Sequence, residues 1–155
     1  MNVAARPATA AEAARIDALA TEAIAEQVDG RGGRVWSVRE GVRRPSGDDL
    51  VAATTDPDQC VLVGTIDDEV VGFATTHVEV LADGAKLGIV TAIYALEGAR
   101  AVGVGEVMLD DVIAWCGAKG CTGIDAHALP GNRDTKNFFE TFGFTARLLV
   151  VHRAL

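Results

Sequence analysis

The sequence predicts an α/β (α+β) fold in which helices flank a sheet. Apolar, β-branched runs separated by turn residues, from Cys60 to Leu96, predict three strands in an antiparallel meander. A glycine-containing turn around Gly103 follows the third of these strands. After it, apolar residues return at helical spacing: Val104, Val107, Met108, Val112 and Trp115. A strand, a turn and a helix therefore follow one another in the second half of the chain.

The composition predicts one globular domain over residues 1–155, because 49% of the 155 residues are hydrophobic. No apolar run approaches the length of a membrane span and no leader segment opens the sequence, so we expect a cytoplasmic protein without a membrane partner. The net charge of −8 argues against nucleic acid and suits a cationic amine. Cys60, Cys116 and Cys121 lack the spacing of a zinc site, so we expect buried thiols and no metal.

The first third of the chain predicts a short strand over residues 3–6 and then an amphipathic helix. Thr9 and Glu12 have the spacing of a capping box at the start of that helix. The helix extends to about Gly30, and its apolar face consists of Ile16, Leu19, Ala20, Ala23 and Ile24.

Residues 31–47 are rich in glycine and arginine and predict a solvated loop. Ser46 is expected to cap a short helix over residues 49–53.

The meander is expected to have strands over residues 60–66, 70–80 and 86–96. On the second strand, the face that carries Phe73, Thr75, His77 and Glu79 either borders a substrate pocket or meets water, and we expect water. Further along, we expect a strand over 122–128, a helix from Asn132 that Gly143 stops, and a last strand over 144–153.

The turn from residue 100 to residue 105 is predicted to bind an anion. The first N–H groups of a helix have no partner within it and carry partial positive charge. Gly103 and Gly105 remove side chains there, so a phosphate can approach those amides. The turn is not a P-loop, because Glu106 follows Gly105, nor a dinucleotide fingerprint, because Met108 stands where a third glycine is needed.

Two motifs resemble those of the GNAT (Gcn5-related) N-acetyltransferases. Residues 100–105 read Arg-x-x-Gly-x-Gly, which is similar to the acyl-CoA-binding turn of that family. Residues 132–144 are similar to its Asn-x-x-Ala-x-x-Leu/Phe-Tyr-x-x-x-Gly-Phe helix, with Asn132, Phe138, Gly143 and Phe144 in register and Thr135 in place of alanine. The resemblance covers roughly residues 60–145. It implies a GNAT acyl-CoA N-acyltransferase fold, whose central mixed, mostly antiparallel sheet has two splayed parallel strands, here ending near residues 96 and 128.

The resemblance also implies a function, the transfer of an acetyl group from acetyl-CoA to a primary amine of a small molecule or peptide by direct attack. The pantetheine arm of acetyl-CoA is expected to pair with Ile93, Tyr94 and Ala95. The other cofactor-binding candidates are Arg100, Ala101, Val102, Gly103, Val104, Gly105, Glu106, Asn132 and Phe139. In this family the segment after the first helix commonly lines the acceptor side, so the resemblance also makes Trp36 and Arg39 candidate contacts for the acceptor substrate.

The resemblance leaves the catalytic acid open. Phe139 stands where the family has the tyrosine that hydrogen-bonds the CoA sulfur, and a phenyl ring cannot donate a proton. Tyr94, the only tyrosine of the chain, is a candidate replacement. The missing hydroxyl also leaves an alternative function open, a non-catalytic CoA-binding sensor or structural module.

For the catalytic base, His127 matches the position of a glutamate in the ribosomal-protein N-acetyltransferase branch. Glu97 and the pair His77 and Glu79 are alternatives. About a dozen residues follow the last helix where the family has two strands, so either the sheet is one strand short or a partner covers its edge. The apolar segment Leu148–Val151 leads us to expect a homodimer.

Overall fold

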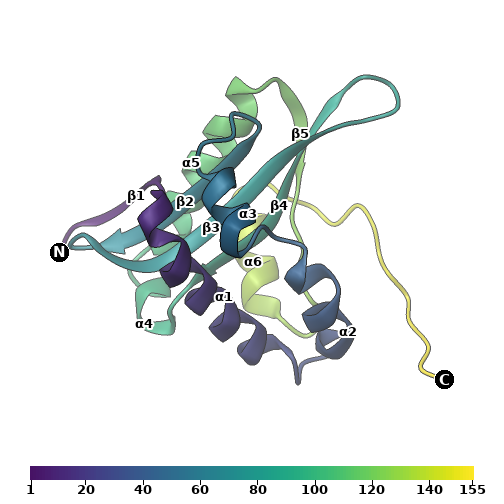
Figure 1. Ribbon diagram of the computed structural model, residues 1–155. Coiled ribbons are helices and arrows are strands. Elements are labelled where there is room, and N and C mark those ends of the chain that lie inside the picture. The colour runs from purple at the N-terminus through teal and green to yellow at the C-terminus, as the bar shows by residue number, and fades with distance from the viewer.

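The computed structural model describes residues 1–155 and has a five-stranded mixed sheet between helices (Figure 1). The strands lie in the order β1 (Val3–Pro7), β2 (Gln59–Ile66), β3 (Glu69–Val80), β4 (Lys86–Ala95) and β5 (Cys121–Asp125). The first four are antiparallel to their neighbours, and β5 is parallel to β4. The predicted fold class, a mixed and mostly antiparallel sheet with flanking helices, is confirmed.

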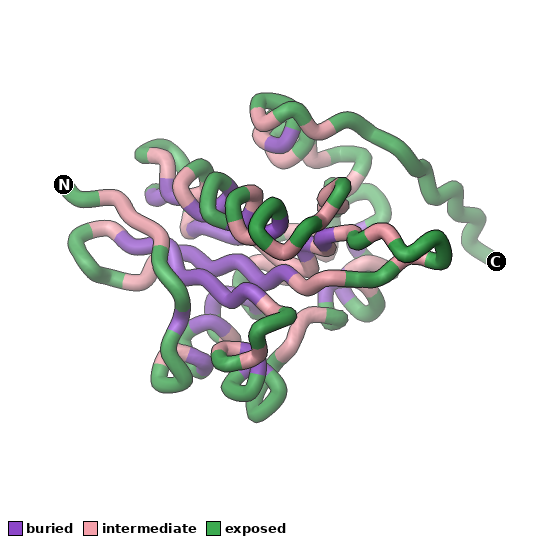
Figure 2. Tube along the Cα trace, turned by 90° about the horizontal axis from the view of Figure 1, so that it is seen from above, coloured by how far each residue is buried: buried purple, intermediate pink, exposed green.

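Helices cover both faces of the sheet. One face packs against α1 (Ala13–Gln27) and α3 (Gly47–Ala53), and the other against α5 (Val104–Ala118). Side chains of β2 alternate between the two faces of the sheet. Val61 and Val63 belong to the buried cluster with α1 and α3, while Leu62 belongs to the buried cluster with α5. Figure 2 shows the buried strands between the more exposed helices. None of the helices has the length and apolar composition needed to cross a bilayer.

The remaining elements are short. They are the 3₁₀ turns η1 (Ala10–Glu12) and η2 (Glu40–Val42) and the helices α2 (Gly33–Val38), α4 (Glu97–Arg100) and α6 (Arg133–Thr141). The expected solvated loop over residues 31–47 is therefore wrong in part, because α2 and η2 form there. Ser46 is the N-cap residue of α3, but its side chain makes no capping hydrogen bond. Its carbonyl accepts from the backbone N–H groups of Asp49 and Leu50.

The predicted local signals at three turns are present. The backbone N–H of Thr9 donates to the Glu12 carboxylate at 2.9 Å, as in a capping box. Asp67 and Asp68 have φ values of 48° and 69°, which suit a two-residue hairpin turn. Gly143 has a φ of 84° directly after α6, where a left-handed residue ends a helix.

Two paired glycines bring α5 close to the sheet. Gly64 of β2 lies opposite Gly72 of β3. A Cβ atom on Gly64 would come within 2.5 Å of the Val104 side chain, and one on Gly72 within 3.0 Å of Met108. Only glycine permits this approach, which fixes the beginning of α5 against the sheet.

The parallel pair β4–β5 separates part-way along. Their register runs from Lys86 opposite Cys121 to Ile89 opposite Asp125 and then stops. Strand β4 continues to Ala95 and pairs only with β3 there. The two strands are thus splayed, as the resemblance implied, although β5 ends three residues earlier than the predicted strand over 122–128.

An irregular register marks β4 close to this separation. The pairing with β3 shifts between Thr75 and Thr76, so Thr91 has no partner residue of its own. The Thr91 hydroxyl lies 2.7 Å from the Thr75 hydroxyl and donates to the Thr75 carbonyl at 3.1 Å. The expectation that this face of β3 meets water is wrong for Phe73 and Thr75, which are buried under α1 and its neighbours.

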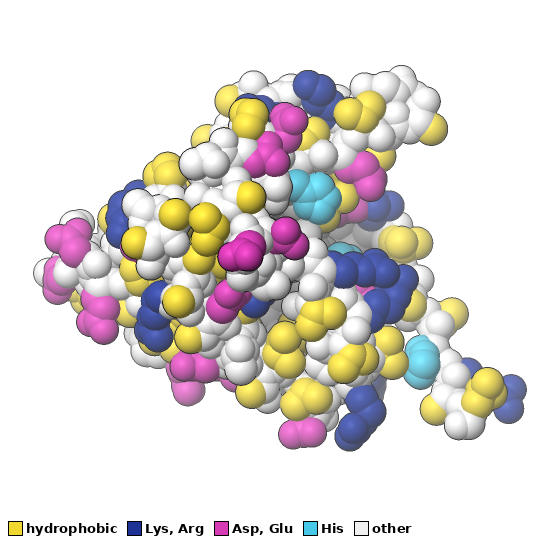
Figure 3. Space-filling view, viewed as in Figure 1, with side chains coloured by type: hydrophobic (Ala, Val, Ile, Leu, Met, Phe, Trp, Pro, Cys, Tyr) yellow, Lys and Arg dark blue, Asp and Glu magenta, His cyan; other side chains and the backbone are white.

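The predicted last strand over residues 144–153 is also wrong. Residues 144–155 form no strand, and β5 is left as an edge strand paired only with β4. The side chain of Arg147 donates to both oxygens of Asp125, which ties the beginning of this C-terminal tail to β5. Beyond it the apolar side chains of Leu148, Leu149, Val150 and Val151 are exposed, and the tail leaves the body of the molecule (Figures 2 and 3).

Candidate active site

A pocket opens where β4 and β5 separate. It encloses about 660 Å³ of empty space, part of it open to solvent. Its walls come from α1, the α2–η2 segment, β3, β4, the residues after β5, and α6. Seventeen residues line it: Ala20, Ala23, Ile24, Gln27, Trp36, Gly41, Arg44, Phe73, Val90, Thr91, Ala92, Ile93, Tyr94, Ala126, His127, Thr135 and Phe139.

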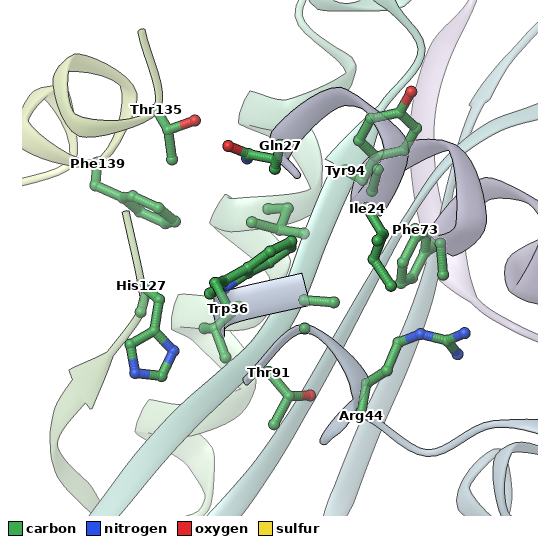
Figure 4. Close-up of a pocket in the computed structure, with 17 residues that line it drawn as sticks. Ile24, Gln27, Trp36, Arg44, Phe73, Thr91, Tyr94, His127, Thr135 and Phe139 are labelled. Carbon is green, nitrogen blue, oxygen red and sulfur yellow. The ribbon is translucent and has the colours of Figure 1, made fainter. Parts of the chain in front are cut away.

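His127 and Phe139 meet in this pocket. His127 follows the end of β5, and Phe139 is on the buried side of α6. In Figure 4 the imidazole lies below the Phe139 ring, and Trp36 lies near the centre of the pocket. Phe139 packs against Phe138 and Phe144 with ring centroids 5.3 and 5.2 Å away. The structure thus brings the predicted base and the residue at the predicted acid position to one cavity, with no hydroxyl on the latter.

The predicted anion turn lies at the beginning of α5. Gly103 is its N-cap residue, with a φ of 92° and no side-chain hydrogen bond to the first turn. The amides of Val104, Gly105 and Glu106 are therefore left without partners in the helix. Gly105 faces α6, because a Cβ atom there would lie 3.3 Å from the Phe138 ring. Free N–H groups at the start of a helix carry the partial positive charge that favours an anion.

The Arg100 side chain turns away from those amides. Its Nε donates to the Ala95 carbonyl at 2.8 Å, and its Nη2 donates to Glu26 of α1 at 2.6 Å. Its guanidinium also lies 5.2 Å from the centroid of the Tyr94 ring. Arg100 therefore joins the end of β4 to α1 in this structure.

Tyr94 points its hydroxyl to the same glutamate. The hydroxyl donates to the Glu26 carboxylate at 2.7 Å, and in Figure 4 it points away from His127 and Phe139. Burial, followed by the hydrogen bond to Glu26, raises the pKa of Tyr94 to about 12. The phenol therefore keeps its proton at neutral pH, but the structure does not bring that proton to the side of the pocket where His127 lies.

Asn132 has two structural partners. Its side-chain oxygen accepts from the backbone N–H of Thr135 at 3.1 Å and so caps α6. Its side-chain nitrogen donates to Gln27 of α1 at 3.2 Å. Asn132 thus connects α6 with α1 across the opening between β4 and β5.

The other predicted candidates are divided between pocket and surface. Trp36 lines the pocket, whereas Arg39 is exposed and pairs with Glu40 at 2.7 Å. Glu97 is exposed at the start of α4 and does not line the pocket. His77 and Glu79 lie near the far end of β3 and do not line it either.

The sequence analysis missed three polar residues of the pocket: Gln27, Arg44 and Thr91. Gln27 continues the helical series of Ala20, Ala23 and Ile24, so its spacing was a signal. Thr91 stands in an apolar run and Arg44 among several arginines, and neither pattern distinguishes them.

The three cysteines are thiols without a disulfide. Cys60 and Cys116 are buried, and Cys121 is half-buried. Burial raises the pKa of Cys60 to about 11 and that of Cys116 to about 12, so both stay protonated. No cluster of three or more His, Cys, Asp or Glu side chains is arranged to hold a metal ion.

Comparison with known proteins gives the family. The model of the Acetyltransferase (GNAT) family matches residues 33–144, which is most of the chain. No curated protein matches the sequence. The chain belongs to the GNAT acetyltransferase family, as the two motifs implied.

Solved structures support the same fold. The tetramutant of the BH1408 protein from Bacillus halodurans has a TM-score of 0.80 at 20% identity, over 100% of both chains. An aminoglycoside acetyltransferase from an uncultured soil metagenomic sample, in complex with sisomicin, has a TM-score of 0.70 at 15% identity, over 99% of this chain and 95% of that one. Glucosamine-6-phosphate N-acetyltransferase from Arabidopsis thaliana has a TM-score of 0.69 at 13% identity, over 99% of each chain. At such identities the similarity shows the fold alone.

Proposed function

We propose that this protein transfers an acetyl group from acetyl-CoA to a primary amine of a small molecule or peptide. The observation that carries the proposal is the end of the β4–β5 pairing at Ile89 and Asp125. Beyond it one backbone edge of β4 is open, beside the uncapped start of α5 and the pocket that holds His127.

The residues present fit acetyl-CoA along this path. The open edge of β4, from Val90 to Ala95, offers backbone groups to the amides of a pantetheine arm. The carbonyl of Ala95 already accepts from Arg100, so the residues before it are the better partners. The amides of Val104, Gly105 and Glu106 would hold the pyrophosphate.

Acetyl-CoA would supply an acetyl group activated as a thioester. The acceptor nitrogen attacks the thioester carbon, so that a C–N bond forms and the C–S bond breaks. His127 takes the proton that the amine loses, directly or through water. A backbone N–H of β4 near Ala95 donates to the carbonyl oxygen as negative charge develops on it. With Phe139 in place of the tyrosine, the thiolate leaves unaided or takes a proton from water.

We further propose that the protein works as a homodimer. Leu148, Leu149, Val150 and Val151 form an exposed apolar run, and β5 is an unpaired sheet edge on the same side. A second copy would cover both, which lowers the cost of exposing apolar surface and free backbone groups to water.

The proposed reaction is tested by release of the CoA thiol from acetyl-CoA in the presence of a panel of amines. We expect amine-dependent release together with acetylated product by mass spectrometry. CoA binding by calorimetry without release for any amine would support the non-catalytic sensor instead, a reading that the missing hydroxyl at Phe139 favours. Absence of both binding and release would contradict either function.

A further inference from the structure

Arg44, in the wall of the pocket, has two hydrogen-bond donors, Nε and Nη2, that bond to no other group of the chain. The Arg44 side chain is only 10% exposed. Its Nη1 donates to Asp17 of α1 and to the Pro45 carbonyl, both at 2.8 Å. Its Nε is buried and has no partner, and Nη2 makes no hydrogen bond within the chain either.

Nε and Nη2 lie on the same edge of a guanidinium, and their N–H groups match two oxygens of a carboxylate or phosphate. Arg147 shows how such an edge holds a carboxylate, because its Nε and Nη2 donate to the two oxygens of Asp125. A buried donor without a partner is rare in native proteins. The free edge of Arg44 therefore has the geometry of a binding group for an oxyanion.

Asp17 holds Arg44 in place from the other side. One oxygen of Asp17 accepts from Arg44, and the other accepts from the backbone N–H of Gly47 at 3.0 Å. The guanidinium is further confined by the Phe73 ring, whose centroid lies 5.9 Å away. In Figure 4 Arg44 and Phe73 lie on the opposite side of the pocket from His127.

The lining of the pocket contains no carboxylate. Among the lining residues a polyamine would therefore find no negative side chain, whereas an anion finds Arg44. The neighbouring sequence strengthens this preference, because residues 31–44 hold five arginines and one glutamate in a chain whose net charge is −8. Figure 3 shows Lys and Arg side chains gathered on the right of the view, the side on which α2 lies in Figure 1.

The geometry points to an acceptor that carries an oxyanion, a carboxylate or a phosphate, which the Nε–Nη2 edge of Arg44 binds while the amine lies at His127. This inference rests on the proposed acetyltransferase function and narrows its substrate class to amines with an acidic group. Asp17 acts as a positioning residue for Arg44.

The test compares matched acceptors with the wild-type protein. The pairs are 4-aminobutyrate and its amide, β-alanine and its amide, and glucosamine 6-phosphate and glucosamine, with 1,4-diaminobutane as a dication. In each pair we compare kcat/KM of the anionic acceptor with that of its neutral counterpart. For the preferred oxyanion, carboxylate or phosphate, we expect the anionic acceptor to be better by about tenfold or more, which is the range of a charge-assisted hydrogen bond. The carboxylate and phosphate pairs show which oxyanion is preferred.

Arg44→Gln should abolish most of this preference by lowering kcat/KM for the anionic acceptor alone. Arg43→Gln is the matched control, since it removes the same charge at an exposed residue that does not line the pocket. If Arg44→Gln does not fold, Arg44→Lys keeps the ion pair with Asp17 but loses the two-donor edge, and the preference should shrink.

Equal or better acetylation of the neutral amines or the diamine by the wild-type protein would overturn the inference and leave the proposed function intact. So would a preference for anions that Arg44→Gln and Arg43→Gln change equally. Lack of acetylation of every acceptor would instead contradict the proposed function and the inference with it.

Discussion

His127 reaches the pocket because β5 ends two residues earlier, at Asp125. Asp125 is held by Arg147, whose hydrogen bonds keep the pKa of that carboxyl below its usual value. The carboxylate thus stays charged close to the imidazole without belonging to the pocket lining. His127 itself is exposed enough to exchange protons with water, which suits a base that works directly or through a water molecule.

If His127 is the base, His127→Ala should lower kcat/KM by about 10²-fold or more and leave CoA affinity unchanged. The rate–pH profile should also lose an ascending limb, because a base must be deprotonated before it can take a proton. His152→Ala, on the exposed tail, is the control and should behave like the wild type. Full activity of the His127→Ala protein, measured as CoA thiol release, would leave proton removal to solvent.

The sequence predicted which residue types lie near the site better than where their side chains point. The motif register placed His127 and Phe139 at the pocket, and both line it. Tyr94 was a candidate acid, but its hydroxyl turns to Glu26, a residue 68 positions away. Such directions depend on which helix packs over a strand, and no local pattern encodes that packing.

At the scale of elements, two pairs of glycines determine different properties of the start of α5. Gly64 and Gly72 allow the helix to approach the sheet, and Gly103 and Gly105 leave its first amides uncovered. The position of these amides relative to β4 is therefore a consequence of sheet packing as much as of the turn itself.

Gly105→Ala should weaken CoA binding by about tenfold or more, measured by calorimetry. The added methyl group would stand 3.3 Å from the Phe138 ring and narrow the space between α5 and α6. The lost contacts are charge-assisted hydrogen bonds. Thermal unfolding should change little, since alanine favours a helix and offsets the tight contact.

Gly98→Ala is the control for that change. Gly98 lies in α4 close to the same turn, and a Cβ atom there meets nothing within 4 Å. CoA affinity should stay at the wild-type value in this variant. Equal affinity in the Gly105→Ala protein as well would place the pyrophosphate elsewhere.

The stabilisation that the contact between Arg6 and Glu12 gives to the fold should depend on pH. The hydrogen bonds from Arg6, aided by the backbone of Thr9, lower the pKa of Glu12 from 4.5 to about 2. Because the folded pKa is the lower one, the stabilisation is complete above about pH 4.5 and is lost as the pH falls toward 2.

Glu12→Gln should therefore reduce the free energy of unfolding by about 1 kcal/mol at pH 7, and the difference from wild type should vanish near pH 2. Urea denaturation at both pH values measures this. Glu22→Gln removes the same charge from an exposed site on α1 and should have a smaller effect. A difference that persists at pH 2 would mean that Glu12 acts through packing.

The elements that the sequence predicted well are those with strong local signals. The capping box, the Asp67-Asp68 turn and Gly143 set boundaries that the structure reproduces within a few residues. The α2 helix was missed, because glycines and arginines over residues 31–39 favour a loop locally and the helix is held by contacts with α1 and η2. The last strand was predicted from apolar β-branched residues, which form a strand only where a neighbouring strand is available.

On the scale of the whole molecule, the C-terminal tail exposes apolar side chains that no other part of a single chain covers. Leu149 is 83% exposed and Val151 is 91% exposed. Arg147 anchors the tail at β5, so its apolar residues start beside the unpaired edge of the sheet. We propose a second copy as the partner, because a two-fold axis would bring the same apolar surface of both chains together.

We expect light scattering to give the mass of a dimer at micromolar concentration. The double change Leu149→Asp and Val151→Asp should give a monomer, because two charges in an apolar contact are costly. Val80→Asp introduces a charge at an exposed valine of β3 and should leave the dimer intact. A stable wild-type monomer at that concentration would contradict the homodimer.

The separation of β4 from β5 also has a kinetic signature. In an antiparallel ladder, alternate residues direct their N–H groups to one neighbour or the other. Along residues 90–95, apart from the irregularity at Thr91, amides directed to β3 are paired, and those directed to the gap face no strand. In deuterated water the amide hydrogens paired with β3 should exchange slowly, and those that face the gap should exchange quickly. Adding CoA should slow only the second set, so this one strand would report the stability of the sheet and the occupancy of the gap separately, residue by residue.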